Sequence, residues 1–244
     1  MKPGPAPQEI PRHDLPEVAP PGEDRAVAAI LAALARGEIP DDDVFDAIYA
    51  PRWRELSWQH WTPTDIADLA IDWLTRGGAR RVLDVGSGIG KLCAYGALVT
   101  DDVTFVGVEH RAELVEEARR TAERLGVSHR LELRHGTLDD VDPADIDAVY
   151  LYNPFAENRY ADEIDRIDSS VPLGEEHFER DVGVVMRWLE RAPIGLRLVT
   201  FHGFGGEVPA CFRPVATHRS GRDTLRAWQK HLPSSALREK HRPG

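Results

Sequence analysis

The chain has 244 residues, of which 42% are hydrophobic and 29% are charged, a composition that suits one α/β domain and excludes a fibrous protein or a disulfide scaffold. Its 41 acidic residues against 30 Lys and Arg give a net charge of −11, which disfavours binding to nucleic acid. No apolar run approaches the roughly 20 residues needed to span a bilayer, so we expect no membrane partner.

Residues 1–22 are rich in proline and polar residues and contain no apolar signal segment, which predicts a disordered tail. Cys93 and Cys211 are distant in sequence and have no metal-ligand spacing, so we expect two reduced thiols in a cytoplasmic protein. Apolar residues recur at helical spacing from Ala26 to Leu34, and residues 23–57 are interpreted as an N-terminal helical cap.

A better-marked helix is predicted before the first strand. Thr62 is suited to cap its N-terminus, and Pro63 is suited to its first position. Apolar residues from Ile66 to Leu74 share one face, and Gly77 and Gly78 end the helix.

From residue 81 onward, strand and helix patterns alternate. We expect five strands, at residues 81–85, 104–108, 131–134, 146–152 and 196–201, with helices at 90–98, 112–125 and 178–189. Alternation of this kind predicts an α/β fold with a mostly parallel sheet and helices on both faces. Two further strand-like runs, 212–218 and 224–229, flank a short turn with a glycine and predict an antiparallel hairpin, for seven strands in all. We assign residues 58–232 to this domain and 233–244 to a flexible tail.

The strongest chemical signal is Asp84-Val85-Gly86-Ser87-Gly88-Ile89-Gly90, where a strand runs into a glycine-rich turn that opens a helix. Glycines let the backbone approach a ligand at the carboxyl end of a strand. A phosphate-binding P-loop is excluded because Leu92 follows Lys91 where Ser or Thr is needed. The dinucleotide-binding motif is incomplete because Lys91 stands in the position of its third glycine. Asp84 suits a cationic ligand better than a pyrophosphate.

The Asp84-to-Gly90 segment resembles the first motif of the class I S-adenosylmethionine-dependent methyltransferases. The resemblance covers roughly residues 58–230 and implies a Rossmann-like fold with S-adenosylmethionine as cofactor. Glu109 ends the second strand, where the family binds both ribose hydroxyls. The resemblance implies a cofactor site made of Asp84, Gly86, Ser87, Gly88, Glu109, His110, Thr137, Leu138 and Asn153.

Two further positions bear on this cofactor site. Thr137 stands where the family often has an acid that holds the adenine amino group, so Asp139 or a backbone carbonyl is the alternative. Thr62-Pro63 resembles the helix start ahead of the cofactor strand in amino-methyltransferases. Thr62 is therefore either a ligand of the cofactor carboxylate or only a helix cap.

Tyr152-Asn153-Pro154-Phe155 follows the fourth strand and resembles the Asn-Pro-Pro-aromatic motif of nitrogen methyltransferases, with one proline missing. That resemblance implies that Asn153 orients the acceptor nitrogen, while Tyr152 assists or lines the pocket. A plain strand end with a packed Phe155 is the alternative. We expect a methyltransferase that acts on a nitrogen of a protein or small molecule, and the histidine spacing predicts no metal site.

Two other functions stay open at this point. An NAD(P)-dependent oxidoreductase would also place an acid at Glu109. A non-catalytic cofactor-binding protein would keep Asp84 and Glu109 but have a defective acceptor pocket. His202-Gly203-Phe204-Gly205-Gly206, after the fifth strand, is interpreted either as a plain turn or as a mobile loop over the acceptor. The oligomeric state cannot be predicted from the sequence.

Overall fold

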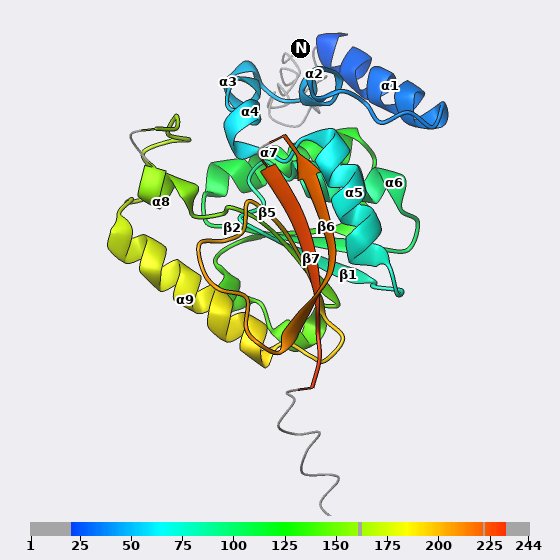
Figure 1. The fold of residues 1–244 in the computed structure, drawn as a ribbon. Coiled ribbons are helices and arrows are strands. Elements are labelled where there is room, and N and C mark those ends of the chain that lie inside the picture. Colours follow the sequence, from blue (N-terminus) through cyan, green and yellow to red (C-terminus); the bar gives the residue numbers. More distant parts are fainter. Residues whose placement is uncertain (1–20, 161–162, 222, 233–244) are drawn as a thin grey trace, which may run out of the picture.

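A computed structural model describes residues 21–160, 163–221 and 223–232 (Figure 1). The tail predicted at 233–244 lies outside the described residues, as do residues 1–20 of the predicted N-terminal tail. The first helix, α1 (Pro21–Ala35), already begins within the last two residues assigned to that N-terminal tail.

The sheet has the predicted α/β topology. In the described chain, seven strands are hydrogen-bonded in the order β3-β2-β1-β4-β5-β7-β6. The five strands from β3 to β5 are parallel, and β7 is antiparallel to both of its neighbours. The bounds are β1 (Arg81–Val85), β2 (Thr104–Glu109), β3 (Leu131–His135), β4 (Ala148–Tyr152), β5 (Arg197–Phe201), β6 (Phe212–Ser220) and β7 (Asp223–Lys230). The predicted mostly parallel sheet with a terminal hairpin is therefore confirmed.

Helices cover both faces of this sheet, as predicted. The larger ones are α5 (Thr64–Thr75), α6 (Lys91–Val99), α7 (Ala112–Arg124) and α9 (Glu175–Arg191). The structure also has four short helices whose individual bounds were not predicted. They are α2 (Asp42–Asp46), α3 (Pro51–Glu55), α4 (Ser57–His60) and α8 (Ala156–Tyr160). Each has four or five residues, too few to show a helical period in the sequence. Single 3₁₀ turns occupy Ser128–Arg130, Leu138–Asp140 and Pro143–Asp145.

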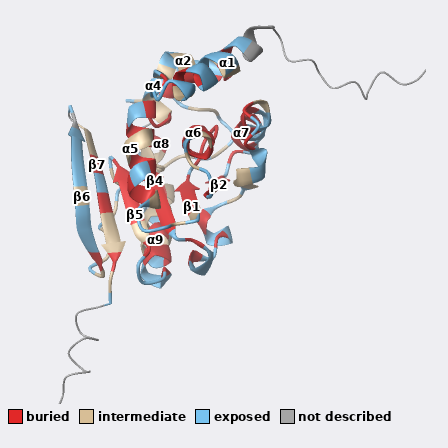
Figure 2. Cartoon of the chain, turned by 90° about the vertical axis from the view of Figure 1, so that its right-hand side faces the viewer, coloured by how far each residue is buried: buried red, intermediate tan, exposed pale blue. Residues whose placement is uncertain are grey.

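Alternating side chains of the strands build two separate cores, and Figure 2 shows the central strands as mostly buried. In β1, Val82 packs with α5 and α6 in one core, whereas Leu83 and Val85 pack with α9 in the other. This alternation follows from the two-residue period of a strand. It also directs Asp84 toward α6, where its carboxylate accepts a hydrogen bond from Cys93 at 3.7 Å.

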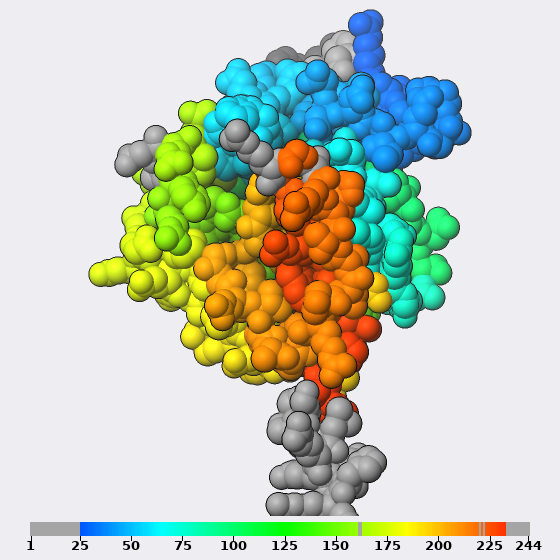
Figure 3. Space-filling model, in the orientation of Figure 1, coloured from blue at the N-terminus to red at the C-terminus, as the bar shows by residue number. Residues whose placement is uncertain are grey.

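The N-terminal helices share the core of the main domain and are packed against it in Figure 3. Ile30, Phe45 and Trp53 belong to the same buried cluster as Leu74. The expected boundary between residues 57 and 58 falls inside α4. Residues 23–57 therefore complete the fold of the domain that follows them.

Lys91 anchors these N-terminal helices to the glycine turn. Its side chain is 2% exposed, and its ammonium group lies 2.7 Å from both Asp42 and Asp46. Lys91, which stands in the position of the third glycine of the dinucleotide-binding motif, thus forms an ion-pair cluster between α2 and α6.

The prediction that Thr62 caps α5 was wrong, because the N-cap position is Pro63. The buried Thr62 hydroxyl instead lies 3.1 Å from the Tyr150 hydroxyl in β4. The backbone N–H of Thr64 donates to Asp42, so a carboxylate from α2 caps the helix in place of a local side chain. Sequence alone does not show this cap because the partner lies 22 residues away.

No helix in the described part of the chain is long and apolar enough to cross a bilayer.

Candidate functional site

A cavity of about 570 Å³ opens at the carboxyl ends of the parallel strands. Open α/β sheets bind ligands at this edge. Residues that follow β1, β2, β3, β4 and β5 all contribute to the wall, together with α4 and the segment from α8 into α9. The volume suits a ligand of cofactor size.

The glycine turn after β1 forms the floor of the cavity. Gly86 and Gly88 have φ angles of 70° and 54°, which side-chain-bearing residues rarely adopt. A Cβ on Gly88 would lie 2.4 Å from the Trp61 ring, and one on Gly86 would lie 3.0 Å from Pro154. The turn thus packs closely against Trp61 and Pro154, and position 88 has room for glycine only.

Glu109 at the end of β2 faces the cavity and is 4% exposed. One carboxylate oxygen accepts the backbone N–H of Gly88 at 3.1 Å, and the other accepts the backbone N–H of Arg111 at 2.9 Å. A carboxylate oxygen can accept more than one hydrogen bond, so Glu109 retains capacity for ligand hydroxyl groups. It joins the glycine turn to the segment after β2.

The segment after β3 supplies a third part of the wall, from Gly136 to Asp139. Gly136 donates its N–H to the carbonyl of Glu109 at 2.9 Å, which places the two strand ends side by side. Asp140 accepts a hydrogen bond from the Thr137 backbone N–H and closes a capping box around the next 3₁₀ turn. This segment is held by its own hydrogen bonds and presents Thr137 and Leu138 to the cavity.

Asn153, Pro154 and Phe155 line the cavity after β4, and His202 lines it after β5. Asn153 has a φ of 36°, and its backbone N–H donates to the carbonyl of Gly203 at 3.0 Å. No described residue makes a hydrogen bond with its side-chain amide. That amide is available to a ligand.

Tyr152 lies beside Asn153 and lines the cavity. Its ring stacks on His202 with centroids 5.7 Å apart, and its hydroxyl lies 3.5 Å from the carbonyl of Gln59. Burial, reinforced by the charges of Asp223 and Asp42, raises the pKa of Tyr152 to about 12. The phenol is therefore protonated at neutral pH and can donate a hydrogen bond.

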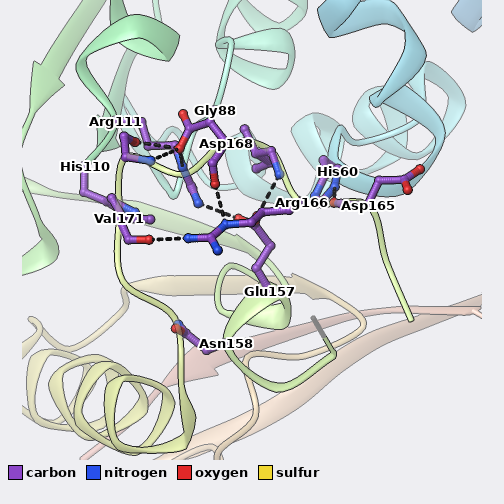
Figure 4. Close-up of polar contacts among 12 residues, drawn as sticks. His60, Gly88, His110, Arg111, Glu157, Asn158, Asp165, Arg166, Asp168 and Val171 are labelled. Atoms are coloured by element: carbon purple, nitrogen blue, oxygen red, sulfur yellow. Dashed lines mark hydrogen bonds and ion pairs between the residues drawn. The ribbon is translucent and has the colours of Figure 1, made fainter. Parts of the chain in front are cut away.

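A buried arginine ties the segment after α8 to the cavity wall (Figure 4). Arg111 is 4% exposed and lies 2.8 Å from Glu157 and 3.2 Å from Asp168. Glu157 also accepts the backbone N–H of Ile167 at 2.9 Å. A buried charge destabilises the fold unless an opposite charge pairs with it, so Arg111 and its two carboxylates depend on one another. The three side chains therefore fix this segment against the end of β2.

α4 contacts the same segment on its other side (Figure 4). The side-chain amide of Gln59 exchanges hydrogen bonds with Asp165, and His60 Nε2 lies 2.7 Å from the Asp165 carbonyl. Burial lowers the pKa of His60, so its neutral ring donates Nε2–H to that carbonyl. The cavity is thereby closed on the side of α4.

Comparison with known proteins adds to this geometry. Residues 23–141, just under half of the chain, match the family model described as protein-L-isoaspartate(D-aspartate) O-methyltransferase. Among curated proteins, none matches the chain.

Two solved structures are similar in fold. An RNA methyltransferase from Salinibacter ruber in complex with S-adenosyl-L-homocysteine is 22% identical, with a TM-score of 0.50, and the match covers 71% of this chain and 96% of that one. TrmN from Thermus thermophilus is 15% identical, with a TM-score of 0.52, and the match covers 73% of this chain and 52% of that one. At these identities the likeness shows the fold.

The matched family model is a methyltransferase model, and it spans both the glycine turn and Glu109. The match and the fold together identify the chain as an S-adenosylmethionine-dependent methyltransferase with the class I fold. This identification sets aside the NAD(P)-dependent oxidoreductase.

Most residues predicted for the site of this methyltransferase lie in one cavity wall. Those residues are Gly86, Gly88, Glu109, His110, Thr137, Leu138, Tyr152 and Asn153. Asp84, Ser87 and Thr62 do not belong to the wall, since their side chains are buried behind it. Burial, opposed by the Cys93 hydrogen bond, raises the pKa of Asp84 to about 7. Asp84 thus acts on the turn from the side of α6.

Several wall residues of the methyltransferase were missed from the sequence, among them Trp61, Arg111, Glu157 and His202, although His202 was noted as part of a loop. Arg111 follows Glu109 directly, but its partner Glu157 is 46 residues away. A local pattern carries no signal for such a pair. The left-handed backbone at His202 also has no sequence signal.

Proposed function

We propose that this methyltransferase transfers the methyl group to a nitrogen atom of a protein or small molecule. The observation that carries the proposal is the Asn153 side chain, which lines the cavity at the end of β4 without a protein partner among the described residues. Its amide oxygen can accept a hydrogen bond from an acceptor N–H and orient the nitrogen lone pair. Phe155 offers an apolar wall next to it.

The proposed cofactor site is formed by the wall segments that follow β1, β2 and β3. We place the ribose at Glu109, the adenine along Gly136–Asp139 and the methionine part over Gly86 and Gly88. The cavity volume, the missing Cβ atoms and the free acceptor capacity of Glu109 support this fit. When bound, S-adenosylmethionine supplies a methyl group already activated by the sulfonium charge.

The chain's own residues supply position and exclude water. Asn153 orients the acceptor, and Tyr152 lines the pocket with a protonated phenol. The Arg111 cluster holds Glu157 and the stretch next to Asp168 at the cavity wall, which keeps solvent from the reacting atoms.

A carboxylate oxygen is the second candidate acceptor, because the matched family is described as an O-methyltransferase of isoaspartate. That match ends at residue 141, before β4 and Asn153, so it covers the cofactor half of the cavity only. A nucleic acid, the acceptor named for the Salinibacter protein, is disfavoured by the net charge of −11. The two arginines of the wall, Arg111 and Arg180, are also paired with carboxylates.

The test is Asn153→Ala, assayed with labelled S-adenosylmethionine against total protein, small-molecule and RNA pools. We expect turnover to fall about tenfold, the loss of about one hydrogen bond, while cofactor affinity by calorimetry stays unchanged. Asn158→Ala is the matched control, since that amide is already engaged by the Gly174 N–H. Loss of cofactor binding in Asn153→Ala would move the residue to the cofactor site. No transfer to any pool would favour the non-catalytic cofactor-binding protein.

A further inference from the structure

His202 has an unusual backbone at the edge of the cavity. Its φ is 60°, and among described residues other than glycine only Asn153 shares a positive φ. The two residues directly follow the adjacent strands β4 and β5, and the Asn153 N–H donates to the carbonyl of Gly203, the residue after His202. Strained conformations of this kind persist where the surrounding structure imposes them, and they cluster at functional sites.

The imidazole of His202 lies between a carboxylate and the cavity. Its Nε2 is 3.5 Å from the Asp223 carboxylate, at the start of β7. Its ring stacks on Tyr152, and its backbone N–H donates to the Thr224 carbonyl at 3.4 Å. A carboxylate beside Nε2 favours the proton on that nitrogen, which leaves Nδ1 as the free base.

We propose that His202 is the proton acceptor of the methyl transfer and that Asp223 is its positioning residue. This proposal rests on the proposed function. The acceptor nitrogen forms a bond to the methyl carbon while the carbon–sulfur bond breaks and its electron pair stays on sulfur. The proton of the acceptor N–H passes to Nδ1 of His202, and Asp223 stabilises the imidazolium that results.

This assignment narrows the class of acceptor. A carboxylate is already deprotonated at neutral pH and attacks without a base, so a base would serve no purpose for it. An amine or another N–H group must lose a proton during transfer. His202 therefore favours a nitrogen acceptor over the carboxylate that the matched family description names.

Tyr152 and Asp223 are the titratable side chains that face the imidazole, from β4 and β7. Burial raises the pKa of Tyr152 to about 12, so its phenol is not a base near neutral pH. Asp223 is 44% exposed on its side chain and stands behind the ring. Of these three groups, the imidazole is the one that both lines the cavity and offers a free basic nitrogen.

The experiment measures tritium transfer from S-adenosylmethionine by the full chain into total protein and small-molecule pools. The variants are His202→Asn, which tolerates a positive φ, and His202→Gly with added imidazole. Asp223→Asn removes the charge behind the ring. His129→Asn is the matched control, because His129 is exposed and lies outside the cavity wall.

We expect the label to be stable in alkali, as N-methyl groups are and methyl esters are not. His202→Asn should lose about 100-fold or more in turnover with unchanged cofactor affinity, the usual contribution of a general base. Asp223→Asn should lose activity by a smaller factor. Imidazole should restore activity to His202→Gly.

Alkali-labile label, or a His202→Asn rate within about threefold of the control, would overturn the assignment of His202 while leaving a working methyltransferase. The threefold limit lies far below the usual contribution of a general base. No rescue of His202→Gly by imidazole would assign the residue a structural role. Absence of transfer from the wild-type protein to every pool would overturn the proposed function itself.

Discussion

Glu109 combines two tasks at one position of the wall. Its carboxylate accepts the backbone N–H of Gly88, which holds the turn in place, and it also presents oxygens to the cavity. Glu109 therefore both positions the turn and offers hydrogen-bond acceptors in the ribose site that we propose. Which task matters more for cofactor binding can be measured directly.

We predict that Glu109→Ala weakens S-adenosylmethionine binding by about 1.5–3 kcal/mol, because charge-assisted hydrogen bonds to the ligand are lost. Calorimetry measures the change, and circular dichroism checks that the variant is folded. Glu113→Ala is the control, since Glu113 forms an exposed pair with Arg52 outside the wall of this cavity. An unchanged affinity in folded Glu109→Ala would contradict the ribose position.

Asp84 makes the stability of the protein depend on pH. Burial raises its pKa to about 7, so between about pH 4 and pH 7 the native state binds more protons than the unfolded state. The free energy of unfolding of the ligand-free protein therefore falls as the pH rises through this range and levels off above pH 7. The contribution of Asp84 is about 4 kcal/mol.

Asp84→Asn should remove this contribution. We expect urea denaturation at about pH 5 and pH 8 to show a smaller loss of stability for the variant than for the wild type. Asp101→Asn is the control, because Asp101 is exposed at the end of the segment after α6. The same pH dependence in wild type and Asp84→Asn would show that Asp84 is charged in the native state throughout.

At the scale of elements, the contact between α2 and α6 decides how the N-terminal helices are held. Lys91 is 2% exposed and pairs with Asp46, which is 8% exposed. Burial raises the pKa of Asp46, opposed by the charge of Lys91. The two charges depend on each other, so removal of one leaves the other buried without a partner.

We predict that Lys91→Met lowers the free energy of unfolding by about 3–5 kcal/mol, the cost of breaking a buried ion pair from one side. Arg36→Met removes an exposed pair with Glu38 and should cost less than about 1 kcal/mol. Urea denaturation compares the two variants. Adding Asp46→Asn to Lys91→Met should recover part of the loss, and a further loss would contradict the pairing.

At the scale of the whole molecule, the shared core predicts one cooperative unit. The N-terminal helices bury Ile30, Phe45 and Trp53 against the same cluster that packs α5 and α6 on the sheet. Separate unfolding of residues 23–57 would expose that cluster to water, at a cost that scales with the apolar area exposed.

We therefore expect the full chain to unfold in a single transition in urea. Far-UV circular dichroism and tryptophan fluorescence should share one midpoint, because Trp53 in α3 and Trp188 in α9 report on opposite parts of the fold. Because the chain has six tryptophans, the difference in signal between the wild type and Trp53→Phe or Trp188→Phe isolates each reporter. A lower midpoint for the signal from Trp53 would mean that the N-terminal helices open first.

The sequence by itself determined the strands, the larger helices and the motifs at the strand ends. Strand β1 lies at Arg81–Val85 as predicted, because short apolar runs and the glycines that end them are local signals. The meeting of Gly88, Glu109 and Thr137 at one edge also followed, since parallel strands bring their carboxyl ends together.

Only the tertiary structure decided which side chains reach the cavity and what holds them there. Thr62 bonds Tyr150 instead of capping a helix, and Asp84 faces α6 instead of the cavity. Arg111 meets Glu157 and Asp168, which lie 46 and 57 residues away in sequence. Such pairs depend on the packing of distant segments and on backbone angles such as that of His202, and neither leaves a periodic pattern in the chain.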